Sequence, residues 1–328
     1  MTKSPERPWL VEYEALTAGA GVVDFSDRTL VELNGDDRAQ FLHNLSTNDI
    51  RRLQEGAGCE AFLINVQGKT LAYIYVFAEP DRLVIETGGG MAEKMLAHLD
   101  RYLVREKVVL ADRGQTHVEL YLAGAEADQV LARLDVVPPG APLGTVGARI
   151  AGHRVQVRRC DYTGPVGYLI ESAKDSFEGV RAALVDAGAQ PCGREALEAA
   201  RVECGTPIYG RDITEKNLPQ EIARDQRAIS FVKGCYLGQE TVARIDALGH
   251  VNRTLAGVRF EGPQLPETGA ALVRAGQDVG HVTSATFSPA LAAPLALAYL
   301  RRGSEAVGTQ LESATGPAEV VQLPVRSV

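Results

Sequence analysis

Short blocks of apolar and polar residues follow one another along the first half of the chain and predict strands and helices in turn. Residues 29–33 alternate as a half-buried strand does, and a polar turn follows them. Apolar side chains then recur at helical spacing, first at Phe41, Leu42 and Leu45 and again between 91 and 103. Three further apolar runs predict strands, the first two joined as a hairpin by a Gln-Gly-Lys turn: 61–66, 71–78 and 83–86.

The middle of the chain mixes strands and helices without strict alternation. Strands are predicted at 154–158 and 166–171, with a turn rich in polar residues and glycine between them. Helices are predicted at 176–187 and 193–203. This mixture predicts α+β lobes.

Two changes in local composition along the chain indicate boundaries between structural units. The proline-rich segment 138–142 interrupts regular structure, so we place a lobe boundary near 138–150. From residue 253 the chain becomes a series of short β-like runs separated by glycine and proline, as in a small antiparallel β-barrel. We therefore predict two α+β lobes within 1–250 and a barrel domain at 251–328.

Composition and charge narrow the function. The chain has 328 residues, which predicts more than one packed unit, and a formal net charge of -8. That negative field argues against a DNA-binding face, and isolated arginine pairs such as Arg51-Arg52 argue against direct RNA binding. No apolar run is long enough to cross a membrane and the first residues carry mixed charges, so we predict a cytoplasmic protein.

The cysteines and histidines show no metal-binding spacing. Neither a Cys-x-x-Cys pair nor a His-Glu-x-x-His motif occurs, so we predict no protein-ligated metal and no stably bound iron-sulfur cluster. Reduced thiols are expected. The five cysteines are Cys59, Cys160, Cys192, Cys204 and Cys235.

The densest group of reactive and special residues is the segment 233–244. Its cysteine, Cys235, stands between Gly234 and Gly238, two residues that permit tight or left-handed backbone. A helix can begin at Gln239, which would place Cys235 just before a helix N-terminus.

This placement predicts a reactive thiol. The positive end of the helix and the nearby Lys233 would both favour the thiolate, and Glu240 would pair with Arg244 across one helical turn. These residues alone leave another interpretation open, in which Cys235 is a small buried hydrophobe.

The segment Lys-Gly-Cys-Tyr-Leu-Gly-Gln-Glu, which runs from Lys233 through Tyr236 to Glu240, resembles the signature of the YgfZ family of folate-binding proteins. Mitochondrial relatives of that family assist iron-sulfur cluster assembly. The resemblance implies two interleaved α+β lobes and a terminal antiparallel β-barrel around a central folate channel. Other stretches look like parts of the related glycine-cleavage T protein: 21–26, 41–42 with 47–49, 65–68, 283–289 and 294–299.

Two departures from the T-protein pattern affect the expected chemistry. T proteins generally carry an acidic residue just after the hairpin turn, where it helps to position and activate the folate, but here the stretch 70–73 is Thr-Leu-Ala-Tyr. This absence argues against glycine-cleavage aminomethyl transfer. Leu169 also stands where T proteins tend to place a glutamate, so the pterin contacts stay open.

Four residues are candidates for folate contacts: Asn65, Gln67, Glu203 and Tyr209. A pterin requires amide or carboxylate groups at its donor-acceptor edge and an aromatic or apolar slot for its rings. The residues alone favour ordinary roles, in which Asn65 and Gln67 shape the turn, Glu203 ends a helix in solvent and Tyr209 packs in the core. The resemblance favours a folate role for Glu203 and the Asn65 turn.

The resemblance implies a tetrahydrofolate-binding accessory protein that supports assembly or repair of iron-sulfur clusters in client enzymes, including tRNA-modifying radical enzymes. Cys235 would be its active thiolate. Two alternatives stay open: a folate-dependent one-carbon transferase or demethylase, and a non-catalytic scaffold that keeps the fold. The expected partners are tetrahydrofolate or a derivative and iron-sulfur client or assembly proteins. Whether the chain turns over a substrate is left open.

Overall fold

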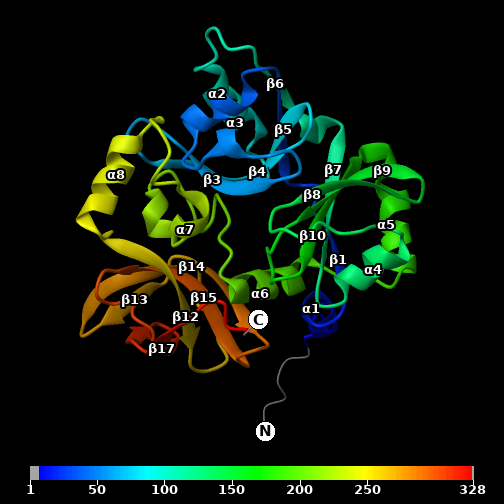
Figure 1. The fold of residues 1–328 in the computed structure, drawn as a ribbon. Helices are drawn as coiled ribbons and strands as arrows, with labels where there is room; N and C mark the ends of the chain where they lie inside the picture. Colours follow the sequence, from blue (N-terminus) through cyan, green and yellow to red (C-terminus); the bar gives the residue numbers. More distant parts are fainter. Residues whose placement is uncertain (1–6, 327–328) are drawn as a thin grey trace.

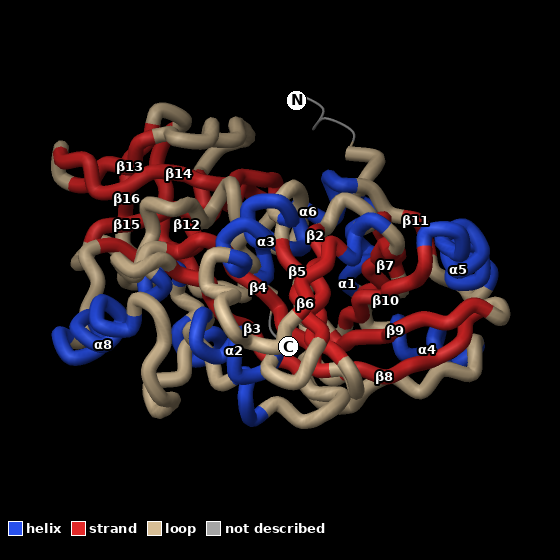
Figure 2. Tube along the Cα trace, turned by 90° about the horizontal axis from the view of Figure 1, so that it is seen from above, coloured by secondary structure: helices blue, strands red, loops and turns tan. Residues whose placement is uncertain are grey.

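The computed structural model describes residues 7–326 as two β-sheet lobes and a β-barrel packed together (Figure 1). Seen from above, the barrel and the six-stranded sheet lie on opposite sides of the molecule, with the five-stranded sheet between them (Figure 2). The predicted α+β class with a C-terminal antiparallel β-barrel is confirmed.

The five-stranded lobe carries the predicted hairpin at one edge. Its elements are β2 (Thr29–Asn34), α2 (Arg38–Leu45), β3 (Gly58–Ile64), β4 (Thr70–Ala78), β5 (Arg82–Thr87), α3 (Ala92–Asp100) and β6 (Val109–Asp112). The strand order is β3-β4-β5-β2-β6. Successive side chains of the hairpin alternate between two cores, as a strand requires: Phe62, Tyr73 and Tyr75 pack toward the centre of the molecule, whereas Ala61 and Ile74 pack under the helices of their own lobe.

The six-stranded lobe is built from two separate stretches of the chain. Its elements are β1 (Gly21–Asp24), β7 (His117–Ala123), α4 (Ala127–Arg133), β8 (Thr145–Ile150), β9 (His153–Arg159), β10 (Gly167–Ala173), α5 (Phe177–Asp186) and β11 (Gln190–Pro191). The order β11-β1-β7-β10-β9-β8 means that the chain leaves this sheet after β1, builds the five-stranded sheet and returns at β7. The segment 138–150 therefore does not separate the lobes, which corrects the predicted lobe boundary: β7 before it and β8 within it belong to one sheet.

The barrel is closed and antiparallel. Its strands are β12 (Arg253–Phe260), β13 (Ala271–Arg274), β14 (Gln277–Ser288), β15 (Ala293–Arg301), β16 (Gln310–Ser313) and β17 (Gly316–Val321). Five of the six follow the apolar runs of the sequence. The sixth, β16, escaped prediction because Leu311 is its one apolar residue.

Four α-helices and four short 3-10 helices complete the described chain. They are α1 (Leu10–Thr17), α6 (Arg194–Cys204), α7 (Asp225–Ala228), α8 (Gln239–Leu248), η1 (Ile50–Arg52), η2 (Arg113–Gln115), η3 (Lys174–Ser176) and η4 (Pro219–Ile222). Helix α6 lies between the barrel and the six-stranded lobe (Figure 1) and contacts α1, β14 and β15. It ends because Gly205 adopts a left-handed conformation, φ 76°, which L side chains rarely adopt.

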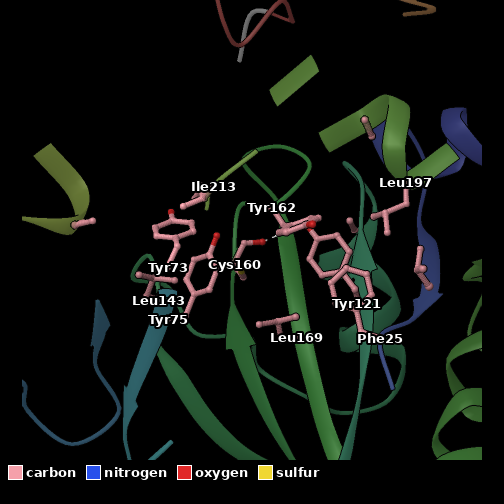
Figure 3. Close-up of a cluster of buried hydrophobic side chains, with 14 of the residues drawn as sticks. Phe25, Tyr73, Tyr75, Tyr121, Leu143, Cys160, Tyr162, Leu169, Leu197 and Ile213 are labelled. Carbon is pink, nitrogen blue, oxygen red and sulfur yellow. Dashed lines mark hydrogen bonds between the residues drawn. The ribbon is translucent and has the colours of Figure 1, made fainter. Parts of the chain in front are cut away.

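An aromatic cluster occupies the centre, where the two lobes and α6 meet. Figure 3 shows Tyr73 and Tyr75 on one side of Cys160, and Phe25, Tyr121 and Tyr162 on the other. The Phe25 ring stacks on Tyr121, with centroids 5.1 Å apart, and meets Tyr162 edge-on at 5.5 Å. We call this group the central aromatic cluster.

A buried arginine joins the two lobes. Arg158 on β9 is fully buried and pairs with Glu79 of the five-stranded lobe at 2.7 Å, and with Glu119 and Glu171 of its own sheet at 3.1 and 2.6 Å. Burial raises the pKa of Glu119. Separation of the lobes would break the buried Arg158–Glu79 pair, which makes separation costly.

Candidate functional site

The segment 233–244 packs against the turn of the β3–β4 hairpin. Gly238 precedes α8 in a left-handed conformation, φ 75°, and a Cβ atom there would lie 2.3 Å from the Asn65 carbonyl oxygen. Gly68 is similarly constrained, since its Cβ would lie 2.6 Å from that of Thr241. The Thr241 hydroxyl also donates a hydrogen bond to the Gln67 carbonyl, 3.1 Å long. The structure thus brings together two regions that the sequence had marked separately.

Lys233 fixes the start of this segment by capping another helix. Its buried ammonium donates hydrogen bonds to the carbonyl oxygens of His43, Ser46 and Asn48, 2.6, 2.7 and 2.8 Å long. These carbonyls lie at the C-terminal end of α2, where a cation is favoured and backbone acceptors lack helical partners. Burial lowers the pKa of Lys233 to about 8. The three bonds occupy all the donors of an ammonium, so Lys233 has none left for Cys235, unlike the arrangement expected from the sequence.

Cys235 itself is exposed, so it is not a buried hydrophobe. It lies before α8, as predicted, and the loop is closed by a 3.3 Å hydrogen bond from the Tyr236 N–H to the Gln239 side chain. Within residues 7–326 the ion pairs do not include the expected one between Glu240 and Arg244.

The four candidate folate residues lie at different places. Asn65 accepts hydrogen bonds from two N–H groups of its own turn, at Gln67 and Lys69, 3.0 and 2.9 Å long. Asn65 and Gln67 line a cavity of about 490 Å³ beside α3. The Tyr209 hydroxyl accepts a 3.1 Å hydrogen bond from Lys94, another residue of that cavity wall.

The Glu203 side chain is buried and binds residues of several elements, so it does not end helix α6 in solvent. Its carboxylate accepts hydrogen bonds from the Tyr13 hydroxyl, 2.6 Å, from the Ser288 hydroxyl and from the Ala290 N–H, 3.1 Å. Arg326 adds an ion pair at 3.0 Å. These partners tie α6 to α1, to the barrel and to the end of the chain, and they leave the carboxylate little capacity for a ligand.

A cavity of about 750 Å³ opens where all three units meet, and we call it the arginine cavity. Residues from both lobes, α6 and the barrel line it, among them Phe25, Arg28, Tyr162, Arg194, Arg211 and Phe287. Phe25 and Tyr162 belong to the central aromatic cluster, so the cavity borders that cluster. Trp9, the one tryptophan of the sequence, also lines it.

Both guanidinium groups and aromatic rings line this cavity. The buried Arg28 lies 5.6 Å from the centroid of Phe25 and 5.4 Å from that of Tyr162, and it pairs with Glu86. Arg194 and Arg211 are more exposed, at 60% and 41% of their side-chain surface, and they pair with Asp27 and Glu198 of the same wall, at 2.8 and 2.7 Å. Such a wall suits a flat, anionic ligand, since the rings stack on it and the guanidinium groups bind its charges. The sequence does not reveal these cavity-lining arginines and aromatic residues, because they are scattered over more than 180 positions and no local motif joins them.

A buried carboxylate lies beside the place where the resemblance led us to expect an acid. Tyr73 projects into the central aromatic cluster and its hydroxyl donates a hydrogen bond to Glu60, on the neighbouring strand β3. Glu60 is 1% exposed and also pairs with Arg227. Glu60 is thus a carboxylate on the same face of the hairpin as Tyr73, contributed by β3 instead of β4.

Among residues 7–326, His, Cys, Asp and Glu side chains do not gather in groups of three or more that could hold a metal ion. Across the same residues no helix is long and apolar enough to cross a membrane.

Comparisons with known proteins agree over nearly the whole chain. Residues 3–232 match the family model described as the GCVT N-terminal domain, and residues 253–325 match the glycine cleavage T-protein C-terminal barrel domain. An aminomethyltransferase of Thermus thermophilus is 30% identical over 308 residues, covering 90% of this chain and 83% of the relative. One from Herpetosiphon aurantiacus is also 30% identical, covering 92% and 84%. The crystal structure of the glycine cleavage system aminomethyltransferase T from Bartonella henselae superposes with a TM-score of 0.88 at 22% identity, covering 97% of this chain and 89% of that one.

Proposed function

This chain belongs to the glycine cleavage T-protein family, and from that premise we propose that it binds a reduced folate in the arginine cavity and acts in folate-dependent one-carbon transfer. The observation that carries the proposal is the cavity itself, in which aromatic rings of the central cluster and the guanidinium groups of Arg28, Arg194 and Arg211 line one space. The relatives named aminomethyltransferases support the same role.

The arginine cavity fits such a ligand in size and chemistry. A reduced folate joins a flat pterin to an aromatic ring and an anionic glutamate. The volume of about 750 Å³ lies in the range of small-molecule sites. Phe25 and Tyr162 would contact the rings, and the exposed Arg194 and Arg211 would bind the carboxylates. When bound, the folate would carry the one-carbon unit.

Glu60 supports the transferase role. Ala72 and Tyr73 occupy the stretch where the resemblance leads us to expect an acidic residue, but the Glu60 carboxylate touches Tyr73 from the next strand. A buried carboxylate on an aromatic face is costly to maintain and is often found where function requires it. Glu60 does not line the arginine cavity, so it would act through Tyr73 and the central aromatic cluster that the cavity borders.

A second candidate function rests on a different observation. Cys235 is exposed on a loop that Lys233 and Gly238 hold in place, and the loop has the sequence that resembles the YgfZ signature. An exposed thiol on an anchored loop suits transient capture of a client sulfur or iron, or formation of a mixed disulfide. This candidate is a folate-binding accessory protein for iron-sulfur enzymes. It would use the same folate site as the first candidate and would not require one-carbon transfer.

One set of variants separates the roles. Tetrahydrofolate binding is measured by anaerobic calorimetry on the wild type, Cys235→Ser and Glu60→Gln. Formation of a one-carbon derivative of tetrahydrofolate is followed by mass spectrometry with aminomethyl or methyl donors. Iron-sulfur enzyme activity is measured in cells that rely on each version.

The outcomes differ by role. A transferase loses product formation in Glu60→Gln and keeps it in Cys235→Ser. An accessory protein forms no such product and loses cellular function in Cys235→Ser. A scaffold tolerates Cys235→Ser in every assay. If the wild type fails to bind tetrahydrofolate, the folate proposal is wrong.

A further inference from the structure

A second large cavity, of about 950 Å³, lies on the other side of the segment 161–163 and is called the barrel cavity here. Asp161 and Thr163 line it, whereas Tyr162 between them lines the arginine cavity. One wall of the barrel cavity is apolar and comes from the barrel and the residues after it: Leu255, Leu297, Val320 and Leu323.

The opposite wall is cationic. Three arginines line the cavity, Arg224, Arg227 and Arg326, against two acids, Asp161 and Glu305. Glu305 lies in the loop after β15, on the barrel side of the cavity. Over residues 7–326, two of these arginines hold ion pairs with carboxylates and the third does not.

The arginine without an ion pair in the described part of the chain is Arg224. Arg227 forms a two-pronged contact with Asp161, 2.8 and 2.7 Å, and Arg326 pairs with Glu203. Arg224 donates to neutral groups, the Gly205 carbonyl at 3.0 Å and the Thr206 hydroxyl at 3.4 Å. Within residues 7–326 no carboxylate lies within ion-pair distance of it.

The backbone next to Arg224 is also unusual. Ala223, which lines the same cavity, has φ 59° and ψ 39°, a left-handed conformation that is uncommon for a residue with a side chain. Backbone of this kind costs free energy and gathers at ligand sites, where it holds a side chain in position. Here it directs the chain into α7 just where Arg224 enters the cavity wall.

We propose that the barrel cavity is a second ligand site, for a small amphiphilic carboxylate whose charged end is bound by Arg224. The carboxylate supplies the anion that Arg224 lacks, and the barrel wall takes the apolar body. The position across residues 161–163 from the arginine cavity lets two ligands approach the central aromatic cluster separately. The site does not require that the arginine cavity bind the folate.

Cys204 provides a local reporter. Its thiol lines the barrel cavity, 3.6 Å from the Asp161 carbonyl oxygen, and burial raises its pKa. Alkylation at mildly alkaline pH is followed by peptide mass spectrometry, so that each cysteine is measured separately. Octanoate is the probe, because it joins one carboxylate to an apolar chain. The exposed Cys235 is the internal control.

Octanoate is expected to slow alkylation of Cys204 saturably and to leave Cys235 unaffected. Arg224→Ala should raise the octanoate concentration that gives half protection about 10- to 100-fold, since a charge-assisted hydrogen bond is lost. Arg211→Ala, in the arginine cavity, should leave it unchanged. If Arg224→Ala does not fold, Arg224→Lys serves instead, because it keeps the charge and loses the two-pronged geometry, with a smaller rise expected.

Three results would overturn the proposal. The first is that octanoate leaves Cys204 alkylation unchanged in the wild type at every soluble concentration. The second is that octanoate protects Cys204 equally well in the folded Arg224 variants. The third is that tetrahydrofolate, and not octanoate, protects Cys204, which would make the barrel cavity the folate site.

Discussion

The hydroxyl group of Tyr73 on β4 donates a hydrogen bond to the carboxylate of Glu60 on β3, and both side chains are buried at the edge of the central aromatic cluster. The two residues are diagonal neighbours, since Glu60 lies directly opposite Tyr75 and Tyr73 opposite Phe62. Burial, reinforced by Glu60, raises the pKa of Tyr73 well above its usual value. Tyr73 therefore stays a hydrogen-bond donor, and Glu60 accepts from it and pairs with Arg227.

Removing this hydroxyl should cost stability. Tyr73→Phe leaves a buried carboxylate oxygen without its donor, so the free energy of unfolding should fall by about 1–3 kcal/mol. Tyr75→Phe is the matched control, because the Tyr75 hydroxyl donates no hydrogen bond to a side chain of the described chain. Denaturant unfolding measures both. Equal losses in the two variants would show that the Glu60 contact contributes nothing specific.

Lys233 should be important for the loop that carries Cys235. Lys233→Met leaves three carbonyl oxygens at the end of α2 without donors, and a loss of about 2–4 kcal/mol in unfolding free energy is expected. Hydrogen exchange should rise in residues 43–48 and 233–238 first. Lys174→Met, at an exposed site, is the control and should change neither quantity. Unchanged exchange in both segments of Lys233→Met would contradict the capping role.

Asp225, the first residue of α7, should make stability depend on pH. Burial raises its pKa from 3.8 to about 6, and its Oδ1 atom has no hydrogen-bond partner. The folded chain therefore holds this proton more tightly than the unfolded chain does. The resulting loss of stability begins as pH rises past about 4 and is complete above about 6.

Asp225→Asn removes this loss. The variant should be more stable than the wild type near neutral pH by about 1–2 kcal/mol, after allowance for solvent screening of a partly exposed group. The difference should shrink toward pH 4. Urea unfolding across this range checks the prediction, and a difference that does not vary with pH would exclude Asp225 as its source.

The sequence predicted the elements whose signal is local. The β3–β4 hairpin, α3 and most barrel strands follow from alternating or helical spacing of apolar residues. The lobe boundary was misplaced because prolines at 138–142 look like a linker, whereas sheet membership depends on pairing between β1 and β7, which are nearly a hundred residues apart.

Side-chain partners were the hardest part to predict. Lys233 was expected to act on its sequence neighbour Cys235, but it reaches back to α2, some 190 positions away. Glu203 was expected to be at a solvated helix end or at a folate, and burial against Tyr13 and Ser288 gives it a third role. Such contacts depend on how the lobes and barrel pack, which no short motif encodes.

The central claim, that a reduced folate binds in the arginine cavity, is tested most directly by the fluorescence of Trp9. This one tryptophan of the chain lines the cavity, so anaerobic titration with tetrahydrofolate should change its emission saturably. The double variant Arg194→Glu and Arg211→Glu should weaken binding at least about tenfold, because two anion-binding groups are reversed. Arg301→Glu with Arg302→Glu makes the same change of charge at exposed barrel positions and should bind like the wild type. Equal affinity in the two double variants, or no saturable change in the wild type, would contradict the account.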